Sequence, residues 1–241
     1  TAGIRLDYES FLSIGSKKAK AGSANEIFSN YRRGGATTHD TWAYNFDLDT
    51  LATNIRQTID FYNEQVYRRQ RMPGKIDADN FVVYDDKRIS WSRDLKLDLQ
   101  RGHLAQFDKA KLRRSLYRPF SKQYLFFDRI MNEEVYQYPN FLPTTSSEGE
   151  NTIICVSDRA GEKPFTCIAT DTIGNLVVAG GFGMPSQCFP FYTYNEDGTN
   201  RRENITDWAL ARFRETYTDE TITKWDVFHY VYALLHHPAY R

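Results

Sequence analysis

The chain has 241 residues, 26% of them charged and 41% hydrophobic, and its 31 Lys and Arg balance 31 Asp and Glu, so its formal net charge is zero. This balance, the absence of a run of eighteen apolar residues and the lack of a basic-then-apolar N-terminus argue against a non-specific nucleic-acid coat, a membrane span and a secretory signal. Cys155, Cys167 and Cys188 are odd in number and widely spaced, which fits neither a disulfide framework nor a zinc site and favours a reducing, cytoplasmic location.

The N-terminal part predicts short elements. A strand is predicted at residues 11–14, and a short helix is predicted to start after Ser23 and to end near Gly34 and Gly35, because glycine tolerates the positive φ that ends a helix. Residues 42–46 alternate aromatic with small or polar side chains, which is typical of a strand.

The clearest helical pattern in the chain comes next. Asp47 or Asp49 can cap a helix whose apolar residues, from Leu48 to Val66, fall at spacings of three and four. The helix ends in a group of cations before the Pro-Gly break at residues 73–74, and these are Arg68, Arg69 and Arg71. Their charge suits the negative C-terminal end of the helix dipole, so they need no ligand to explain them.

A strand, two shorter helices and an aromatic strand are predicted in the middle of the chain. The first strand covers residues 81–84. Ser92 caps a helix that runs to Gly102, and Asp108 caps a second helix that runs through Leu116 and ends before a proline. Residues 120–128 then form the aromatic strand.

The window 101–129 holds the densest positive charge in the chain. Its eight cations face only two acids, Asp108 and Asp128, which leaves +6. The cations are Arg101, Lys109, Lys111, Arg113, Arg114, Arg118, Lys122 and Arg129. Aromatic rings lie among them, and cations mixed with flat rings suit a polyanion that carries flat bases. The alternative is a solvated helix face followed by a half-buried strand, and the residues alone leave both interpretations open.

The last third of the chain predicts strands and then two helices. Short apolar runs at 152–157, 165–169, 176–179 and 188–194 are separated by polar or glycine-bearing turns, and Asp197-Gly198 marks another turn. Thr206 can cap a helix through Tyr217, and Thr223 with Asp226 makes a capping box for a helix through His236. These elements predict an α+β fold: a mixed or antiparallel sheet of short strands with flanking helices, a long helix near the N-terminus and a helical C-terminus.

Catalytic signatures are mostly absent from the sequence. The glycine-rich stretch 179–183 lacks the Lys-Ser/Thr and the spacing of a phosphate-binding loop, so a hairpin or loop is the better interpretation. The Asn/Asp-Pro-Pro-Tyr/Phe segment of amino-methyltransferases is missing. His229, His236 and His237 share one predicted helix, and the spacing of seven from His229 to His236 could align these two, but no third ligand is in view, which favours a packing or C-terminal-dipole role over a metal site.

The sequence offers four polar or glycine-rich loops that could enter a DNA groove. They cover residues 32–40, 146–150, 158–163 and 180–187. Base reading needs Arg, Lys, Asn or Gln on protruding loops, and three of these loops carry such residues: Arg32 and Arg33, Arg159 and Lys163, and Gln187. Each could instead be a plain connection between regular elements.

Seven segments in order resemble the C-terminal specificity region of Type ISP restriction-modification enzymes. They are TWAYNF at 41–46, IDFYNEQ at 59–65, ISWSR at 89–93, SLYRPFSKQYLFFDR at 115–129, QCFPFYTY at 187–194, NITDWA at 204–209 and YVYALLHHPAYR at 230–241. The resemblance covers nearly the whole chain. It implies that residues 1–241 are a target-recognition domain and a fragment of a larger enzyme, with a mostly helical part at 1–100 adjoining a methyltransferase and a sheet with C-terminal helices at 101–241.

The family resemblance also implies partners and cofactors. Those enzymes join a nuclease, a helicase-like ATPase motor, a coupling segment, an adenine-N6 methyltransferase and the recognition domain in one polypeptide. The expected partners are therefore double-stranded DNA and the methyltransferase domain of the same polypeptide, and no membrane. No cofactor is expected in this fragment, whereas S-adenosylmethionine, ATP and Mg²⁺ are expected in other domains of the parent enzyme.

The sequence of a recognition domain must vary where it contacts DNA bases. We therefore expect the family-like segments to form the scaffold of the fold and the loops between them to contact the bases. The predicted groove or base contacts are Arg32, Arg33, Arg159, Lys163 and Gln187. The predicted phosphate contacts are Lys111, Arg114 and Lys122. Aromatic residues of the charged window are expected in the core rather than stacked on bases, and these are Tyr117, Phe120, Tyr124, Phe126 and Phe127.

Two other functions stay open from the sequence. A structural domain could brace the methyltransferase without reading sequence itself. A stand-alone enzyme would need a bound metal or nucleotide, for which the sequence shows no motif.

Overall fold

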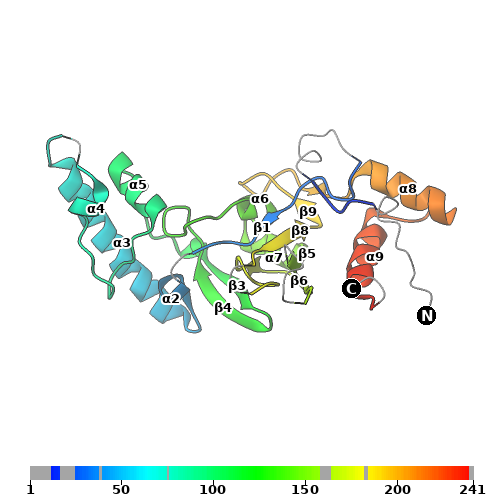
Figure 1. Ribbon diagram of the computed structural model, residues 1–241, viewed down its shortest axis with the longest axis horizontal. Coiled ribbons are helices and arrows are strands. Elements are labelled where there is room, and N and C mark those ends of the chain that lie inside the picture. The colour runs from blue at the N-terminus through cyan, green and yellow to red at the C-terminus, as the bar shows by residue number, and fades with distance from the viewer. Residues whose placement is uncertain are drawn as a thin grey trace.

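The computed structural model describes residues 12–16, 25–37, 40–74, 76–157, 164–181 and 184–238. Figure 1 shows an elongated molecule in which helices α3, α4 and α5 form one end, two small sheets form the middle, and helices α8 and α9 form the other end. This mixture of helices and short-stranded sheets confirms the α+β prediction. The described residues contain no helix long and apolar enough to cross a membrane.

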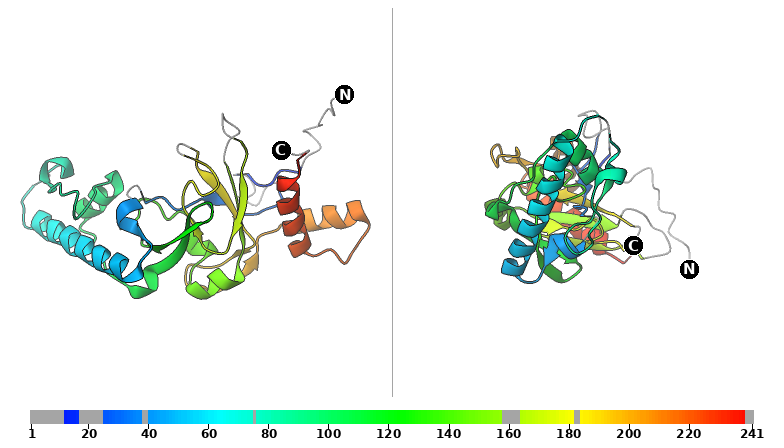
Figure 2. Two further views of the ribbon diagram at one scale, coloured as in Figure 1. Left: turned by 90° about the horizontal axis from the view of Figure 1, so that it is seen from below. Right: turned by 90° about the vertical axis from the view of Figure 1, so that its left-hand side faces the viewer.

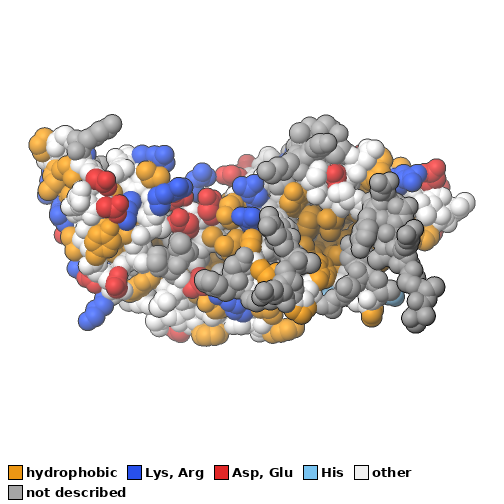
Figure 3. All heavy atoms as spheres, in the orientation of Figure 1, with side chains coloured by type: hydrophobic (Ala, Val, Ile, Leu, Met, Phe, Trp, Pro, Cys, Tyr) orange, Lys and Arg blue, Asp and Glu red, His pale blue; other side chains and the backbone are white. Residues whose placement is uncertain are grey.

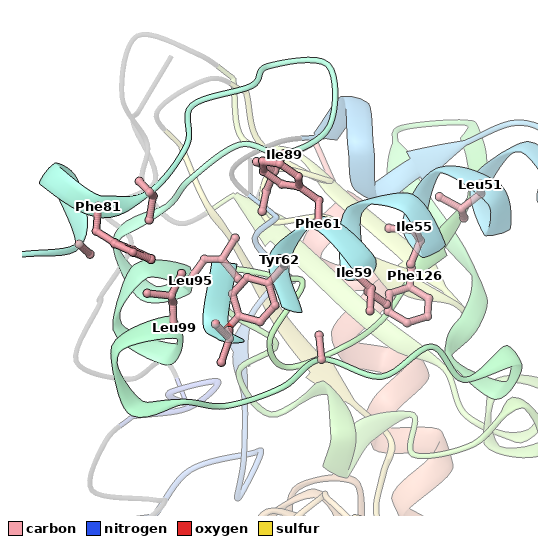
Figure 4. Packing of buried hydrophobic residues seen from close by; sticks show 14 residues of the cluster. Leu51, Ile55, Ile59, Phe61, Tyr62, Phe81, Ile89, Leu95, Leu99 and Phe126 are labelled. Atoms are coloured by element: carbon pink, nitrogen blue, oxygen red, sulfur yellow. The ribbon is translucent and has the colours of Figure 1, made fainter. Parts of the chain in front are cut away.

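Helix α3 (Leu48–Gln70) confirms the predicted long helix, and Asp47 is its cap, with the carboxylate accepting from the Thr50 amide at 2.7 Å. Its apolar stripe packs on α4 (Ala78–Phe81), on α5 (Arg93–Arg101) and on Phe126 of the adjacent sheet. Figure 4 shows Ile59 of α3 lying against Phe126, with Tyr62 directed toward α5. This cluster is the first of three separate cores.

Both ends of helix α5 agree with the sequence prediction, which places them at Ser92 and Gly102. The Ser92 hydroxyl accepts from the Leu95 amide at 3.1 Å, and Gly102 ends the helix with φ 76°, in the left-handed region that glycine adopts at low cost. The strand predicted at residues 81–84 is wrong: Phe81 ends the short helix α4, which Asp77 caps, and residues 82–84 are not in a strand.

The first sheet has the strand order β2-β4-β3-β7. Its strands are β2 (Tyr44–Asn45), β3 (Leu112–Arg118), β4 (Ser121–Phe126) and β7 (Ile173–Gly174), and only the pair β3 and β7 is parallel. The aromatic strand is confirmed as β4. The helix predicted from Asp108 through Leu116 is wrong: Asp108 caps a single 3₁₀ turn (Lys109–Lys111), after which the chain becomes strand β3.

The short helix α2 (Asp40–Ala43) corrects part of the strand predicted at 42–46, of which only β2 is extended. The helix predicted between Ser23 and Gly35 is also wrong. The described part of that stretch is extended, and it contains β1 (Arg32–Arg33) and an isolated bridge from Phe28 to Ile205. A strand is also predicted at residues 11–14, but the described residues 12–14 are not in a strand.

The second sheet is antiparallel, with the strand order β1-β8-β5-β6. Besides β1 it contains β5 (Ile153–Ser157), β6 (Cys167–Thr170) and β8 (Ser186–Pro190). Three of these strands were predicted, whereas residues 176–179 form turns rather than the predicted strand. The two sheets enclose the second core, in which Cys155 and Cys188 pack with Tyr138 and Leu125.

The other face of the second sheet carries the third core. Ile154, Phe189 and Phe28 pack there against α8 (Asp207–Tyr217) and α9 (Lys224–His236). Both helices begin as predicted, with Thr206 and Thr223 as caps, and the Thr223–Asp226 capping box is present. Smaller elements complete the chain: α6 (Tyr138–Phe141), α7 (Thr145–Glu150), β9 (Tyr192–Thr193) and β10 (Arg202–Glu203).

The layers therefore follow one another along the length of the molecule: helices, sheet, sheet, helices (Figure 2). Strands β1 and β2 come from the first hundred residues but pair with β8 and β4 of the later part. A boundary near residue 100 remains a prediction, and these strand pairs show how closely the described parts on its two sides are joined.

Candidate nucleic-acid interface

A groove of about 520 Å³ lies between helix α5 and the edge of the second sheet. It is lined by Arg32, Asp94, Leu97, Asp98, Arg101, Arg129, Glu133, Glu134, Val135, Tyr136 and Gln137, and we call it the arginine groove. Figure 3 shows basic and acidic side chains gathered side by side along the upper edge of the molecule, between the helical end and the sheets. Three segments far apart in the sequence thus build one polar surface.

Arg32 reaches the groove from edge strand β1. Its backbone pairs with Cys188 of β8, and its guanidinium lies 5.1 Å from the centre of the Tyr136 ring. Tyr136 itself has φ 48°, in the left-handed region that non-glycine residues seldom adopt. The Tyr136 ring thus makes a cation–π contact with the Arg32 guanidinium. This contact orients the Arg32 side chain and leaves its N–H groups able to donate hydrogen bonds.

Arg129 enters the groove on a rigid turn. The Asp128 carboxylate, 6% exposed, accepts from the amides of Ile130 at 2.8 Å and Met131 at 2.9 Å. The Asn132 side chain accepts in turn from the Asp128 amide at 2.8 Å. Arg129 is exposed, and within the described structure its guanidinium makes no hydrogen bond or ion pair. The turn therefore presents a guanidinium with all its donors available.

The groove is of mixed charge, not uniformly basic. Arg101, on the last turn of α5, lies 4.0 Å from Asp98, and Asp98 also contacts His103 at 2.8 Å. The side-chain oxygen Oε1 of Gln137 is buried and has no hydrogen-bond partner among the described residues. A surface with guanidinium donors beside carboxylate and amide acceptors has both kinds of group that base edges require.

The predicted reader residues divide between two faces of the second sheet. Arg32 lines the groove, whereas the neighbouring Arg33 pairs with Gln187 across β1 and β8 and so shares the opposite face with it. Arg33 and Gln187 are therefore brought together, but away from Arg32. Arg159 and Lys163 lie outside the described residues. Cations on an edge strand can also serve to keep that edge from pairing with another chain.

The predicted phosphate contacts all lie on or beside the β3–β4 hairpin, each with a partner of its own. Lys111 Nζ lies 2.6 Å from Asp128 Oδ2, and Lys122 lies 3.5 Å from Asp171. Arg114 stacks on the Tyr124 ring, 5.0 Å from its centre. Lys111 thus also neutralises the carboxylate that holds the turn of Arg129, a structural role that the sequence did not reveal.

Two further cations of the charged window are structural. Arg113 is 5% exposed and donates to Glu148 at 2.5 Å and to the backbone carbonyls of Leu142 and Thr144. Arg118 lies over the Tyr117 ring and contacts Asp40 at 3.2 Å. The excess charge counted along the sequence is therefore partly neutralised inside the fold.

The expectation that the aromatic residues of the window belong to the core holds for Phe126, which is fully buried. Tyr117, Tyr124 and Phe127 are partly buried against two of the cores. The expectation of a core position is wrong for Phe120, which is 95% exposed at the turn between β3 and β4. The reason is position: a two-residue turn projects its side chains beyond the sheet.

The described residues contain no cluster of three or more potential metal ligands. Two tyrosines near the β3–β4 hairpin have raised pKa values. Burial raises the pKa of Tyr44 to about 12, with the hydrogen bond from Asn175 opposing the shift, and burial followed by a hydrogen bond to Asp40 raises the pKa of Tyr117. Both phenols thus stay neutral near pH 7 and serve as hydrogen-bonding groups.

The sequence pointed to Arg32 but gave no special role to Arg129, Tyr136 or Gln137. A signal existed for Arg129: an Asp followed four residues later by an Asn is a pattern that closes a turn through side-chain to backbone hydrogen bonds. The support of Arg32 by Tyr136 had no local signal, because it depends on the pairing of β1 with β8.

A family model of the Type ISP C-terminal specificity domain matches residues 26–241 of this chain. A comparison with curated proteins found no match. Solved structures resemble the chain over almost its whole length. The cryo-EM structure of a DrdV–DNA complex matches with a TM-score of 0.79 and 33% identity, covering 98% of this chain and 22% of that one.

Two more structures show the same fold. A nuclease-deletion mutant of the Type ISP restriction-modification enzyme LlaGI, in complex with a DNA substrate mimic, matches with a TM-score of 0.80 and 28% identity over 98% of this chain and 20% of that one. The ATP-dependent Type ISP restriction-modification enzyme LlaBIII bound to DNA matches with a TM-score of 0.77 and 24% identity, over 97% of this chain and 14% of that one. The present chain spans about a fifth or less of the chains that it matches.

Proposed function

This chain belongs to the family of Type ISP C-terminal specificity domains, and we propose on that premise that it recognises a specific sequence in double-stranded DNA. Two of the structures that resemble it above 25% identity are described as complexes with DNA or a DNA substrate mimic. The observation that carries the proposal to the level of residues is the arginine groove, where Arg32, Arg101 and Arg129 converge from three segments.

We assign base reading to the arginine groove. An arginine can donate two parallel hydrogen bonds to the O6 and N7 atoms of guanine, and a carboxylate can accept from the N4 amine of cytosine. The groove offers guanidinium groups at positions 32 and 129, and carboxylates at 133 and 134. Mixed charge suits base edges better than it suits phosphates, because carboxylates repel the phosphate charge.

Phosphate contacts fall to the surrounding cations in this proposal. Arg114 is the best placed, because its described contacts are with a tyrosine rather than a carboxylate. Lys111 and Lys122 would have to share their charge with Asp128 and Asp171. Arg33, Gln187, Arg159 and Lys163 remain candidates for base or groove contact, as the sequence predicts.

The chemistry would be carried out by other domains of a parent polypeptide. Recognition by this domain would direct adenine-N6 methylation by a methyltransferase that uses S-adenosylmethionine, and restriction by a motor and nuclease that use ATP and Mg²⁺. Methyl transfer to a base in a duplex requires that the base be turned out of the stack. The recognition domain would set which adenine reaches that active site.

The proposal is tested by Arg32→Ala and Arg129→Ala, each assayed on duplexes with and without the recognised site. The site is first read by mapping methylation on a plasmid propagated with the intact enzyme. Loss of a bidentate base contact is expected to cost about 1–3 kcal/mol on the cognate duplex and clearly less on a scrambled one. Arg212→Ala on α8, whose side chain is 51% exposed, is the matched control and should change neither. Equal losses on both duplexes would demote these arginines to phosphate contacts.

A further inference from the structure

The turn between β3 and β4 holds a phenylalanine in an unfavourable place. Arg118 pairs with Ser121, so Pro119 and Phe120 form a two-residue turn, and Phe120 has φ 63°. Proline followed by a residue of positive φ is the pattern of a type II turn, in which glycine is the favoured second residue. Phe120 is also 95% exposed. Neither backbone preference nor burial accounts for this side chain, and strained exposed residues of this kind point to a function.

A second exposed phenylalanine lies at the same end of the sheet. Phe46 is 72% exposed and directly follows β2, whose Asn45 pairs with Tyr124, so Phe46 runs beside Gln123 of β4. Phe120 and Phe46 are the two most exposed large hydrophobic side chains among the described residues. Phe46 also borders a shallow hollow of about 260 Å³, which is lined by Asp40, Thr41, Tyr44, Asn45, Phe46, Tyr117 and Gln123.

The cations Arg118 and Lys122, which flank this turn, already have carboxylate partners. Arg118 contacts Asp40 at 3.2 Å, and Lys122 contacts Asp171 at 3.5 Å. A DNA backbone is bound by cations that release counterions from phosphates, and cations that already have carboxylate partners suit this poorly. Aromatic anchors with a neutral polar rim are instead typical of a protein–protein interface.

We propose that Phe46 and Phe120 anchor a docking surface for another folded domain of the same polypeptide. This chain covers only 22% of the matched DrdV chain and 20% of the matched LlaGI chain. In those proteins a domain of this kind is therefore part of a much longer polypeptide. Exposed aromatic rings whose flanking cations are already paired fit a protein partner better than DNA. Docking here does not depend on the arginine groove, and it would hold this domain in a fixed orientation toward its neighbour.

The test is photo-crosslinking in the full-length polypeptide, with Phe120→p-benzoylphenylalanine and mass spectrometry of the products. The expected result is a crosslink to residues outside this 241-residue chain but within the same polypeptide, at equal yield with and without DNA. The matched control carries the same crosslinker at Tyr217, 53% exposed on α8 at the opposite end of the molecule from α3, and should give no such product. Crosslinks to DNA, crosslinks to a second copy of the polypeptide, or a yield no higher than at Tyr217 would each overturn the proposal.

A second variant keeps the test independent of folding and of DNA recognition. Phe120→Gly places the residue favoured at this φ, so the turn should be retained. With the crosslinker placed at Phe46, this variant should lower the yield about tenfold, as expected for removal of one anchor of an interface. Its preference for cognate over scrambled DNA should stay unchanged. An unchanged crosslink yield would contradict the docking role even if the groove is shown to bind DNA.

Discussion

At the scale of single residues, charge in the sequence and charge available to a ligand are different quantities. The window 101–129 has a formal balance of +6, yet four of its cations contact a carboxylate within 3.5 Å. They are Lys111, Arg113, Arg118 and Lys122. Arg129 stands out only in the fold, because Asp128 is engaged by backbone amides and Lys111. Composition could point to the window, but only the structure separates structural cations from available ones.

Arg113 illustrates a structural cation, and its removal should be costly. Arg113→Ala leaves the Glu148 carboxylate buried without its partner, which is expected to lower the free energy of unfolding by about 3–5 kcal/mol. Chemical denaturation followed by circular dichroism measures this. Arg93→Ala, whose side chain is 85% exposed beside Asp94, is the control and should change stability by less than about 0.5 kcal/mol.

The loss in Arg113→Ala should also depend on pH. Burial already raises the pKa of Glu148, and removing the arginine that opposes this shift raises it further. A carboxyl whose folded-state pKa exceeds its unfolded value destabilises the fold as pH rises through that range, and this cost is relieved when the pH falls and the group is protonated. The difference between variant and wild type should therefore shrink toward acidic pH. A difference that grows on acidification would contradict this account.

At the scale of elements, helices with side-chain caps were predictable and short strands were not. Four helices begin at residues named from the sequence: Asp47, Ser92, Thr206 and Thr223. Capping is local chemistry, so three or four residues suffice to reveal it. The stretch after Asp108 misled the prediction because Leu112 and Leu116 are spaced like a helical stripe, whereas pairing with β4 and β7 makes it a strand.

The helix predicted before Gly34 is wrong for a related reason. Its extended form is held by contacts from far along the chain, such as the bridge from Phe28 to Ile205 and the hydrogen bonds of Asn204 with Ser29 and Asn30. Such long-range pairing overrides local propensity and leaves no short sequence signal. The same pairing positions β1, and so the groove could not be assembled from the sequence.

The helix caps should contribute measurably to the stability of the fold. Thr223→Ala removes the hydroxyl that accepts from the Asp226 amide at 3.2 Å and should destabilise α9 by about 1 kcal/mol. Because α9 packs into the third core, the loss should appear in the thermal unfolding of the chain. Thr216→Ala, at an exposed position inside α8, is the control and should cost nothing measurable. A Thr223→Ala variant as stable as the control would show that packing alone holds α9 in place.

At the scale of the whole molecule, three cores follow one another, and the two proposed surfaces lie on different parts of this arrangement. The arginine groove lies where the helical end meets the sheets, and the two exposed phenylalanines lie at the hairpin end of the first sheet. A DNA-reading surface and a domain-docking surface on separate parts of one domain would allow DNA recognition to act through the orientation of this domain toward its neighbour. The family could be predicted from ordered sequence segments, but the separation of these surfaces could not.

The central claim, sequence-specific recognition of DNA, is tested most directly by binding of the polypeptide to short duplexes as a function of salt. We expect the cognate duplex to bind on the order of 10³-fold or more tightly than a scrambled one at physiological salt, with affinity falling steeply as salt rises. Arg32→Ala combined with Arg129→Ala should reduce that ratio. Equal affinity for cognate and scrambled duplexes, without a steep salt dependence, would contradict the account.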